Sequence, residues 1–143
     1  MNGGFLVSKV KQLGDRIFEK ILVNKGVDAF NGAQGRILYV LWNKDGIPIK
    51  FVSEKCGLAI TSLTTMLERM EKQGLIRRVQ ADNDKRKTLL YLTKKARSLK
   101  EEFSSVSNQM EKIFYKGFSD KEITIFEEYL DRVRKNLEEG QQK

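Results

Sequence analysis

Four hydroxyl side chains crowd the start of one predicted helix, which spans residues 60–73. They are Thr61, Ser62, Thr64 and Thr65, and Arg69 follows one turn later. Ser and Thr are common helix caps, but capping accounts for one or two of these hydroxyls and not for all four. A hydroxyl can bond a base edge or a phosphate, and an α-helix fits the major groove of DNA. The cluster therefore predicts a helix that reads DNA.

Three consecutive cations lie in the polar loop that follows this helix. They are Lys85, Arg86 and Lys87. The loop separates two β-compatible runs, residues 76–80 and 88–92, which predicts a β-hairpin with a charged tip. A guanidinium on a thin hairpin fits a narrow minor groove, where the negative potential is enhanced. A solvated cluster of loop charges is the alternative, but the helix pair just before the hairpin favours DNA.

The positive charge of the chain is concentrated around these two elements. The chain carries 27 Lys and Arg and 19 Asp and Glu, a net charge of +8. Residues 44–100 hold 14 of the cations and 6 of the acids, so the remainder of the chain holds 13 of each. A positive field confined to one module indicates a polyanionic partner, although a solvated basic face would show the same count.

The residues of enzymes and metal sites are scarce. There is no histidine, which removes the most common general base and metal ligand. The single cysteine, Cys56, allows no intramolecular disulfide and no structural zinc site. We therefore expect no enzyme, no cofactor and no metal. No run of apolar residues is long enough for a membrane span, and no secretory signal is visible, so we expect a cytoplasmic protein.

Helical periodicity and stop signals divide the rest of the chain. A first helix is expected over residues 5–23, with a stripe formed by Leu6, Val10, Leu13, Ile17 and Ile21. Asn31 is the expected N-cap of a second helix, which ends before the turn Asp45-Gly46. A short third helix begins at Pro48, buries Ile49 or Val52, and closes at Gly57.

Two long helices are expected to end the chain. The first follows Thr93, and the second starts at Ser119, where Ser119 and Glu122 match a capping box. Both carry apolar residues at heptad-like spacing. Such stripes exceed what a core of this size covers, so we expect a homodimer.

At this point the residues resemble a known family. The run VSEKCGLAITSLTTMLERMEKQGLI, followed by DNDKRKTLLYLT, is similar to the helix-turn-helix and wing of the multiple-antibiotic-resistance regulator (MarR) family. The wing pattern is carried by Asp84, Arg86, Leu92 and Thr93. The flanking helices also agree in number and length, so the resemblance covers essentially the whole chain.

The resemblance implies a single winged helix-turn-helix domain over residues 1–143, mainly α with a small β-hairpin wing. Its DNA-binding lobe would span residues 31–93, and long helices at 5–23 and 94–139 would form the homodimer interface. The implied function is a transcriptional repressor on a pseudo-palindromic operator of double-stranded DNA, released by a small ligand or by oxidation.

The resemblance also implies roles for single residues. Thr61, Ser62 and Thr65 would occupy base-reading positions, Arg86 would be the minor-groove residue, and Asp84 would orient a nearby arginine. Ala59 stands where the family often has a capping serine. Cys56 occupies a position that the family fills with an apolar core residue, so we expect a buried, inert thiol.

Two other functions fit parts of the pattern. A winged-helix module that binds protein is one, although protein interfaces are not enriched in lysine. A nonspecific architectural DNA-binding protein is the other, and a specificity ratio against competitor DNA distinguishes it. The operator, the regulated genes, the direction of regulation, the effector and its pocket residues are not readable from the sequence.

Overall fold

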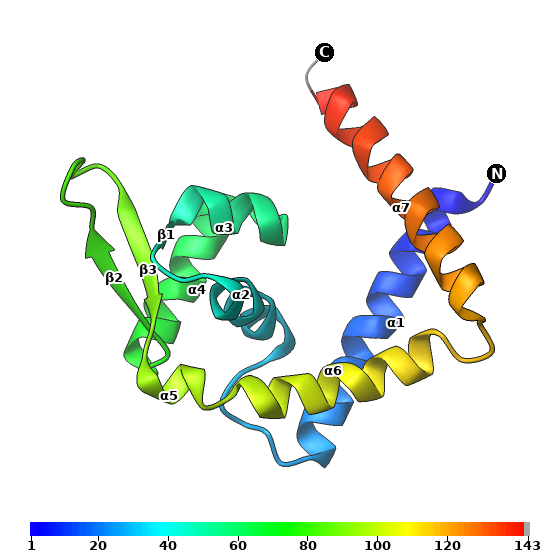
Figure 1. Cartoon of the computed structure of the whole chain (residues 1–143), viewed down its shortest axis with the longest axis horizontal. Coiled ribbons are helices and arrows are strands. Elements are labelled where there is room, and N and C mark those ends of the chain that lie inside the picture. Colours follow the sequence, from blue (N-terminus) through cyan, green and yellow to red (C-terminus); the bar gives the residue numbers. More distant parts are fainter. Residues whose placement is uncertain (142–143) are drawn as a thin grey trace. The chain divides into compact units, whose positions relative to one another are not determined.

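The computed structural model describes residues 1–141 (Figure 1). The chain forms two compact units, one over Met1–Met110 and the other from Glu111 onward. It is 68% helical and contains one small antiparallel sheet of three strands. The prediction of a mainly α fold with a small β element is therefore confirmed.

The first unit holds most of the helices and the whole sheet. Its helices are α1 (Gly3–Asn24), α2 (Gly32–Asn43), α3 (Ile49–Cys56), α4 (Ile60–Lys72), α5 (Lys94–Arg97) and most of α6 (Lys100–Phe114). Its strands are β1 (Ile47–Pro48), β2 (Ile76–Gln80) and β3 (Thr88–Leu92), in the order β1-β3-β2. Both hairpin strands have the bounds predicted from the sequence.

Local signals explain where the helices of this unit begin and end. The Asn31 side chain accepts from the Gln34 backbone N–H at 2.8 Å, and the Gln34 side chain accepts from the Asn31 N–H at 3.2 Å. This reciprocal pair satisfies two free donors at the start of α2. Gly57 (φ +66°) and Gly74 (φ +76°) follow α3 and α4 in the left-handed conformation that glycine adopts without strain.

A short strand, β1, was not predicted. Ile47 pairs with Leu90 and Pro48 with Leu89, while the Gly46 N–H donates to the Leu90 carbonyl at 2.7 Å. Two residues are too few for a period to be visible, and Pro48 is tolerated because this strand lies at the edge of the sheet. Pro48 is thus the N-cap of α3 rather than a residue of its first turn.

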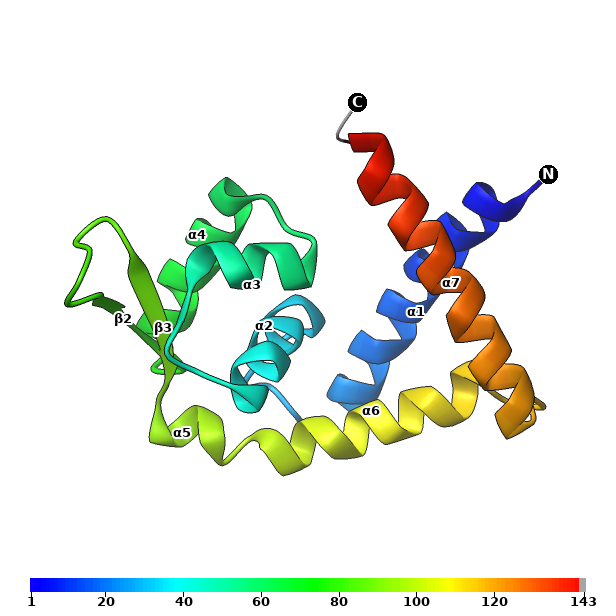
Figure 2. The ribbon, with the colours of Figure 1, turned by 45° about the horizontal axis from the view of Figure 1, so that its top comes forward.

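The core of the first unit lies where α2, α3 and α4 meet the inner face of the sheet. Its largest fully buried side chains are Ile37, Leu38, Leu41, Val52, Leu63, Leu67, Met70, Leu75, Ile76, Leu90 and Val106. Three of these, Leu63, Leu67 and Met70, form one face of α4. Burying this face holds α4 against α3 and leaves its opposite face in solvent. Figures 1 and 2 show the β2–β3 hairpin projecting away from the helices.

The helix expected after Thr93 is interrupted, which corrects the prediction of one continuous helix. Thr93 does cap it, since its hydroxyl accepts from the Ala96 N–H at 3.2 Å. The Ala96 carbonyl, however, accepts from the Trp42 indole N–H at 2.9 Å and from the Leu99 N–H at 3.1 Å. In a continuous α-helix this carbonyl would accept from the Lys100 N–H; here the Leu99 N–H takes that place, α5 ends at Arg97, and α6 starts at Lys100.

The second unit contains α7 (Asp120–Gln141), which begins as predicted. The Glu122 N–H donates to the Ser119 hydroxyl at 3.2 Å, and the Ser119 N–H donates to the Glu122 carboxylate at 2.9 Å. An aromatic cluster packs within this unit, with ring centroids 4.8–6.2 Å apart; its members are Phe114, Tyr115, Phe118 and Phe126. The Tyr115 hydroxyl donates to Glu127 at 2.6 Å, which raises the pKa of Tyr115 to about 12.

Candidate nucleic-acid interface

The exposed face of α4 carries most of the hydroxyl cluster. Thr61, Ser62, Thr65 and Arg69 are exposed, while Leu63 and Leu67 point into the core. This division follows from the helical period, because the apolar stripe takes one side and leaves the other for solvent. Ala59 is the N-cap residue of α4. Its methyl side chain accepts no hydrogen bond from the first N–H groups of the helix.

Thr64 differs from the other members of the cluster. Its side chain is half-buried, and its hydroxyl donates to the Ile60 carbonyl at 2.8 Å. The Thr65 hydroxyl makes a longer contact, 3.4 Å, with the Thr61 carbonyl. Within residues 1–141, the hydroxyls of Thr61 and Ser62 make no side-chain hydrogen bond. Ser62 and Thr61 are thus the members of the cluster that remain available to an external partner.

The tip of the hairpin presents its cations outward. Lys85, Arg86 and Lys87 are exposed, and the Arg86 side chain is 93% exposed. The Asp84 carboxylate accepts from the Arg86 backbone N–H at 3.0 Å and from its Nε at 3.4 Å. Asp84 is half-buried, and its carboxylate contacts both the backbone and the side chain of Arg86.

An ion pair between the hairpin and α4 was missed from the sequence. Arg78 on β2 donates to Glu71 in the last turn of α4, with its NH2 group 2.9 Å from Oε1. Strand alternation places Arg78 on the same side as the buried Ile76, which is the side that faces α4. The sequence therefore contained the signal for this ion pair. Finding it requires that the helical period of α4 and the strand alternation of β2 be combined.

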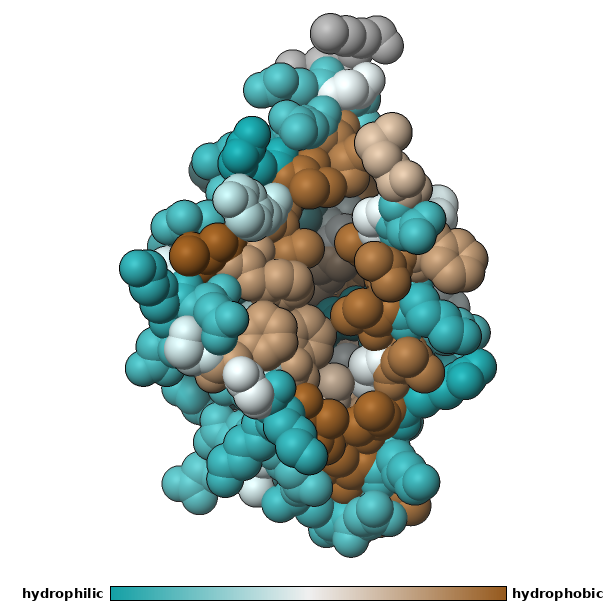
Figure 3. All heavy atoms as spheres, turned by 90° about the vertical axis from the view of Figure 1, so that its right-hand side faces the viewer, coloured by the Kyte–Doolittle hydropathy of each residue, from teal (hydrophilic) through white to brown (hydrophobic). Residues whose placement is uncertain are grey.

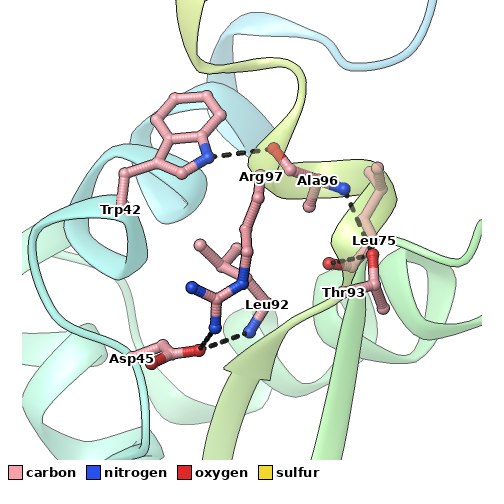
Figure 4. A network of polar contacts seen from close by, with 7 residues as sticks. All are labelled: Trp42, Asp45, Leu75, Leu92, Thr93, Ala96 and Arg97. Carbon is pink, nitrogen blue, oxygen red and sulfur yellow. Dashed lines mark hydrogen bonds and ion pairs between the residues drawn. The ribbon is translucent and has the colours of Figure 1, made fainter.

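A second polar network fixes the base of the hairpin (Figure 4). The Asp45 carboxylate accepts from the Leu92 N–H at 3.2 Å and pairs with Arg97 at 2.8 Å. The Thr93 hydroxyl donates to the Gly74 carbonyl at 2.6 Å, which joins the α4–β2 turn to the end of β3. Asp45 thus extends the pairing of β3 beyond the two residues of β1.

A cavity of about 980 Å³ lies within the first unit, beside α3. Its lining is Arg36, Tyr39, Val40, Asn43, Lys44, Ile47, Pro48, Phe51, Lys55, Cys56, Phe103 and Ser107. The lining of this cavity is mainly apolar and aromatic, and it includes three cations and no carboxylate. The Phe103 ring lies at its wall, 5.8 Å from the Tyr39 ring and 5.1 Å from the Trp42 ring.

Cys56 lines this cavity and is only partly buried, which corrects the expectation of a buried thiol. Its side chain is half-buried, because α3 ends there and packs only one side of the residue against the core. Burial raises the pKa of the thiol, and the nearby Arg36 only partly opposes this. A raised pKa lowers the thiolate fraction at neutral pH, so this environment does not activate the sulfur.

Residues 1–141 offer neither a metal site nor a membrane-spanning helix. No group of three or more Cys, Asp or Glu side chains lies close enough to hold a metal ion there. In the same part of the chain, no helix combines the length and the hydropathy needed to cross a membrane.

Comparison with known proteins places this geometry in a family. Residues 30–88 match the model of the MarR family, a segment that contains α2, β1, α3, α4, β2 and the hairpin tip. Over 64 residues, 41% are identical to the organic hydroperoxide resistance transcriptional regulator of Bacillus subtilis. That alignment covers 45% of this chain and 44% of the relative, and the chain spans half or less of the curated relatives that it matches.

Solved structures extend the likeness to the whole fold. A mutant MarR from E. coli complexed with operator DNA is 25% identical, with a TM-score of 0.81 over 91% of both chains. CouR from Rhodococcus jostii, bound to p-coumaroyl-CoA, shares the fold at 21% identity and a TM-score of 0.78, over 91% of this chain and 90% of that one. The relatives named here are regulators and not enzymes, in agreement with the sequence prediction. Residues 30–88 of this chain thus match the MarR family, and the chain has the winged helix-turn-helix fold of the solved MarR structures.

Proposed function

We propose that this chain is a transcriptional regulator that binds a pseudo-palindromic DNA operator as a homodimer in the cytoplasm. The carrying observation is the pairing of two exposed elements on one rigid core. The hydroxyl face of α4 suits the major groove, and the Arg86 tip suits the adjacent minor groove. The E. coli relative was solved on operator DNA, which supports the same use of the fold here.

Binding to genomic DNA tests this function. We expect the protein to select a small set of fragments from the host genome and to bind them at least about a thousandfold more tightly than scrambled duplexes. Fluorescence anisotropy at several salt concentrations measures both affinities. Equal affinity for selected and scrambled DNA would instead indicate an architectural DNA-binding protein. No salt-dependent binding to any duplex would favour a protein-binding module.

Ser62 and Thr64 are expected to contribute differently to sequence recognition. The Ser62→Ala variant should bind the selected duplex about threefold to tenfold more weakly, with unchanged affinity for scrambled DNA, because a base-reading hydroxyl carries sequence information. Thr64→Ala is the matched control, since its hydroxyl already bonds the Ile60 carbonyl. Equal losses in the two variants would contradict this assignment.

We propose that the dimer forms through apolar side chains that the single chain leaves exposed. On α1 these are Phe5, Leu6, Val7, Val10 and Leu13, and on α7 they are Tyr129, Leu130, Val133 and Leu137. Figure 3 shows hydrophobic side chains open to solvent. Exposed apolar area of this extent is uncommon in monomers and typical of interfaces.

Light scattering should therefore give about twice the chain mass of 16.5 kDa. Leu130→Asp should shift the protein towards the monomer, because a carboxylate in an apolar interface is strongly unfavourable. Lys121→Asp introduces the same group at an exposed polar position and should leave the mass unchanged. A wild-type monomer that still binds the selected duplex tightly would contradict the dimer.

We propose that a small ligand in the cavity beside α3 modulates DNA binding. Three cations, Arg36, Lys44 and Lys55, stand among aromatic walls, so the cavity suits an aromatic anion. Because α3 packs against α4, a ligand wedged against Phe51 would act on the reading helix. The ligand of the Rhodococcus relative, p-coumaroyl-CoA, has a phenolic ring and negative charges, which agrees with this class.

Naphthoate is a suitable probe of this cavity. We expect calorimetry to detect its binding, and we expect Phe51→Ala, at an exposed ring on the cavity wall, to weaken binding about tenfold. Tyr129→Ala removes an exposed ring from α7 and serves as the control. Equal binding by both variants would place the probe elsewhere, and unchanged DNA affinity with naphthoate bound would remove the regulatory role.

A further inference from the structure

The contact between Glu71 and Arg78 uses both oxygens of one carboxylate. The guanidinium donates to Oε1 through NH2 (2.9 Å) and Nε (3.2 Å), and the Arg78 backbone N–H donates to Oε2 at 3.2 Å. Three hydrogen bonds to one carboxylate fix its orientation far better than a single contact between point charges would. Such a contact joins two elements at a defined angle.

These two residues belong to different DNA-reading elements. Glu71 lies in the last turn of α4, next to the buried Met70, and Arg78 lies in the middle of β2 opposite Leu90. In residues 1–141, no other ion pair joins α4 to the hairpin. The neighbouring Arg77 points to the opposite face of the sheet, where its guanidinium lies 5.9 Å from the Tyr91 ring.

Hydrogen bonds at the turn between the two elements hold the base of the hairpin. Only Gln73, Gly74 and Leu75 separate α4 from β2; the Leu75 N–H donates to the Met70 carbonyl at 2.9 Å, and the Thr93 hydroxyl donates to the Gly74 carbonyl at 2.6 Å. The hairpin continues beyond Arg78 to the tip at Arg86. A small rotation at this turn is therefore amplified at the tip.

We propose that Glu71 and Arg78 are positioning residues that hold the hairpin at the angle at which Arg86 and the exposed face of α4 engage the same DNA site. This inference rests on the proposed DNA-binding function. The two side chains are 38% and 29% exposed, so solvent screens their attraction and the pair adds little to global stability. Its contribution is orientation.

Electrostatics alone would make the opposite prediction for a substitution at Glu71. Removing a carboxylate near DNA reduces repulsion of the phosphates and should tighten binding at every sequence. A positioning role instead weakens binding to the selected duplex. The hydrogen bonds with Arg78 lower the pKa of Glu71, so the carboxylate is charged at neutral pH and the two predictions separate clearly.

Glu71→Gln is expected to bind the selected duplex about threefold to tenfold more weakly than wild type. Glu68→Gln is the matched control, because Glu68 is exposed on the same helix and its loss changes the charge equally. We expect this control to bind as tightly as wild type or more tightly. Arg78→Lys keeps the charge but loses the two guanidinium donors that bond Oε1, and should behave like Glu71→Gln.

The decisive measurement is the cost of Arg86→Ala in two backgrounds. In wild type this substitution should weaken binding to the selected duplex by about tenfold or more. In Glu71→Gln it should weaken binding by only about threefold or less, because the tip of a displaced hairpin contributes less to binding. Equal costs, or a Glu71→Gln variant that binds like Glu68→Gln, would overturn the proposal. Circular dichroism melts verify that each variant is folded. If wild type fails to prefer any duplex, the DNA-binding function itself fails, which is a separate outcome.

Discussion

Arg86→Ala is expected to weaken binding to the selected DNA by about tenfold or more and to reduce the salt dependence of the affinity. The slope of log K against log salt should shrink by about 1 per dimer arm. Without the Arg86 cation, the DNA releases about one fewer counterion on binding each arm. The Arg86 side chain is 93% exposed and forms an ion pair with Asp84, so the free energy of unfolding should stay within about 0.5 kcal/mol of wild type.

This result separates binding from folding. Glu101→Ala, at an exposed position on α6, controls for a change of charge away from the hairpin and should leave the salt slope unaltered. Anisotropy titrations at four or more salt concentrations give the slopes. An Arg86→Ala variant that binds like wild type at every salt concentration would place the hairpin tip outside the groove.

Leu67→Ala is expected to have the largest effect on stability, a loss of about 2–5 kcal/mol in the free energy of unfolding. Leu67 is fully buried on the inner face of α4, between the residues that hold this helix against the core. Truncation removes apolar contacts and leaves a cavity that a close-packed core cannot fill. Because this amounts to a large share of a typical domain stability, α4 itself would loosen.

The neighbouring Glu68 supplies the control. Glu68→Ala changes an exposed position of the same helix and should alter the free energy of unfolding by less than about 0.5 kcal/mol. Urea denaturation monitored by the single tryptophan, Trp42, reports on the first unit directly. Equal midpoints for the two variants would mean that α4 is not held by its buried stripe.

Much of the fold was readable from local patterns. The strands of the hairpin, the cap at Asn31, the capping box at Ser119 and the glycine stops after α3 and α4 follow from interactions within a few residues. The apolar stripe of α4 likewise predicted its exposed face, because a helical period links burial on one side to exposure on the other.

Other features depended on partners far along the chain. At the break before α6, the Ala96 carbonyl accepts from the Trp42 indole N–H, 54 residues away. Strand β1 exists because β3 offers an unpaired edge, and Cys56 is half-buried because a cavity opens beside α3. These contacts join residues that are far apart in the chain, so no helical or β period predicts them.

The same division holds for the candidate interface. Residue types and charge by themselves identified the hydroxyl helix and the basic hairpin tip, since both depend on composition within short segments. Only the tertiary structure decided that Thr64 bonds its own helix, that three cations share one cavity, and that Glu71 meets Arg78. Such groups are brought together by packing of the core, which acts between segments rather than within them.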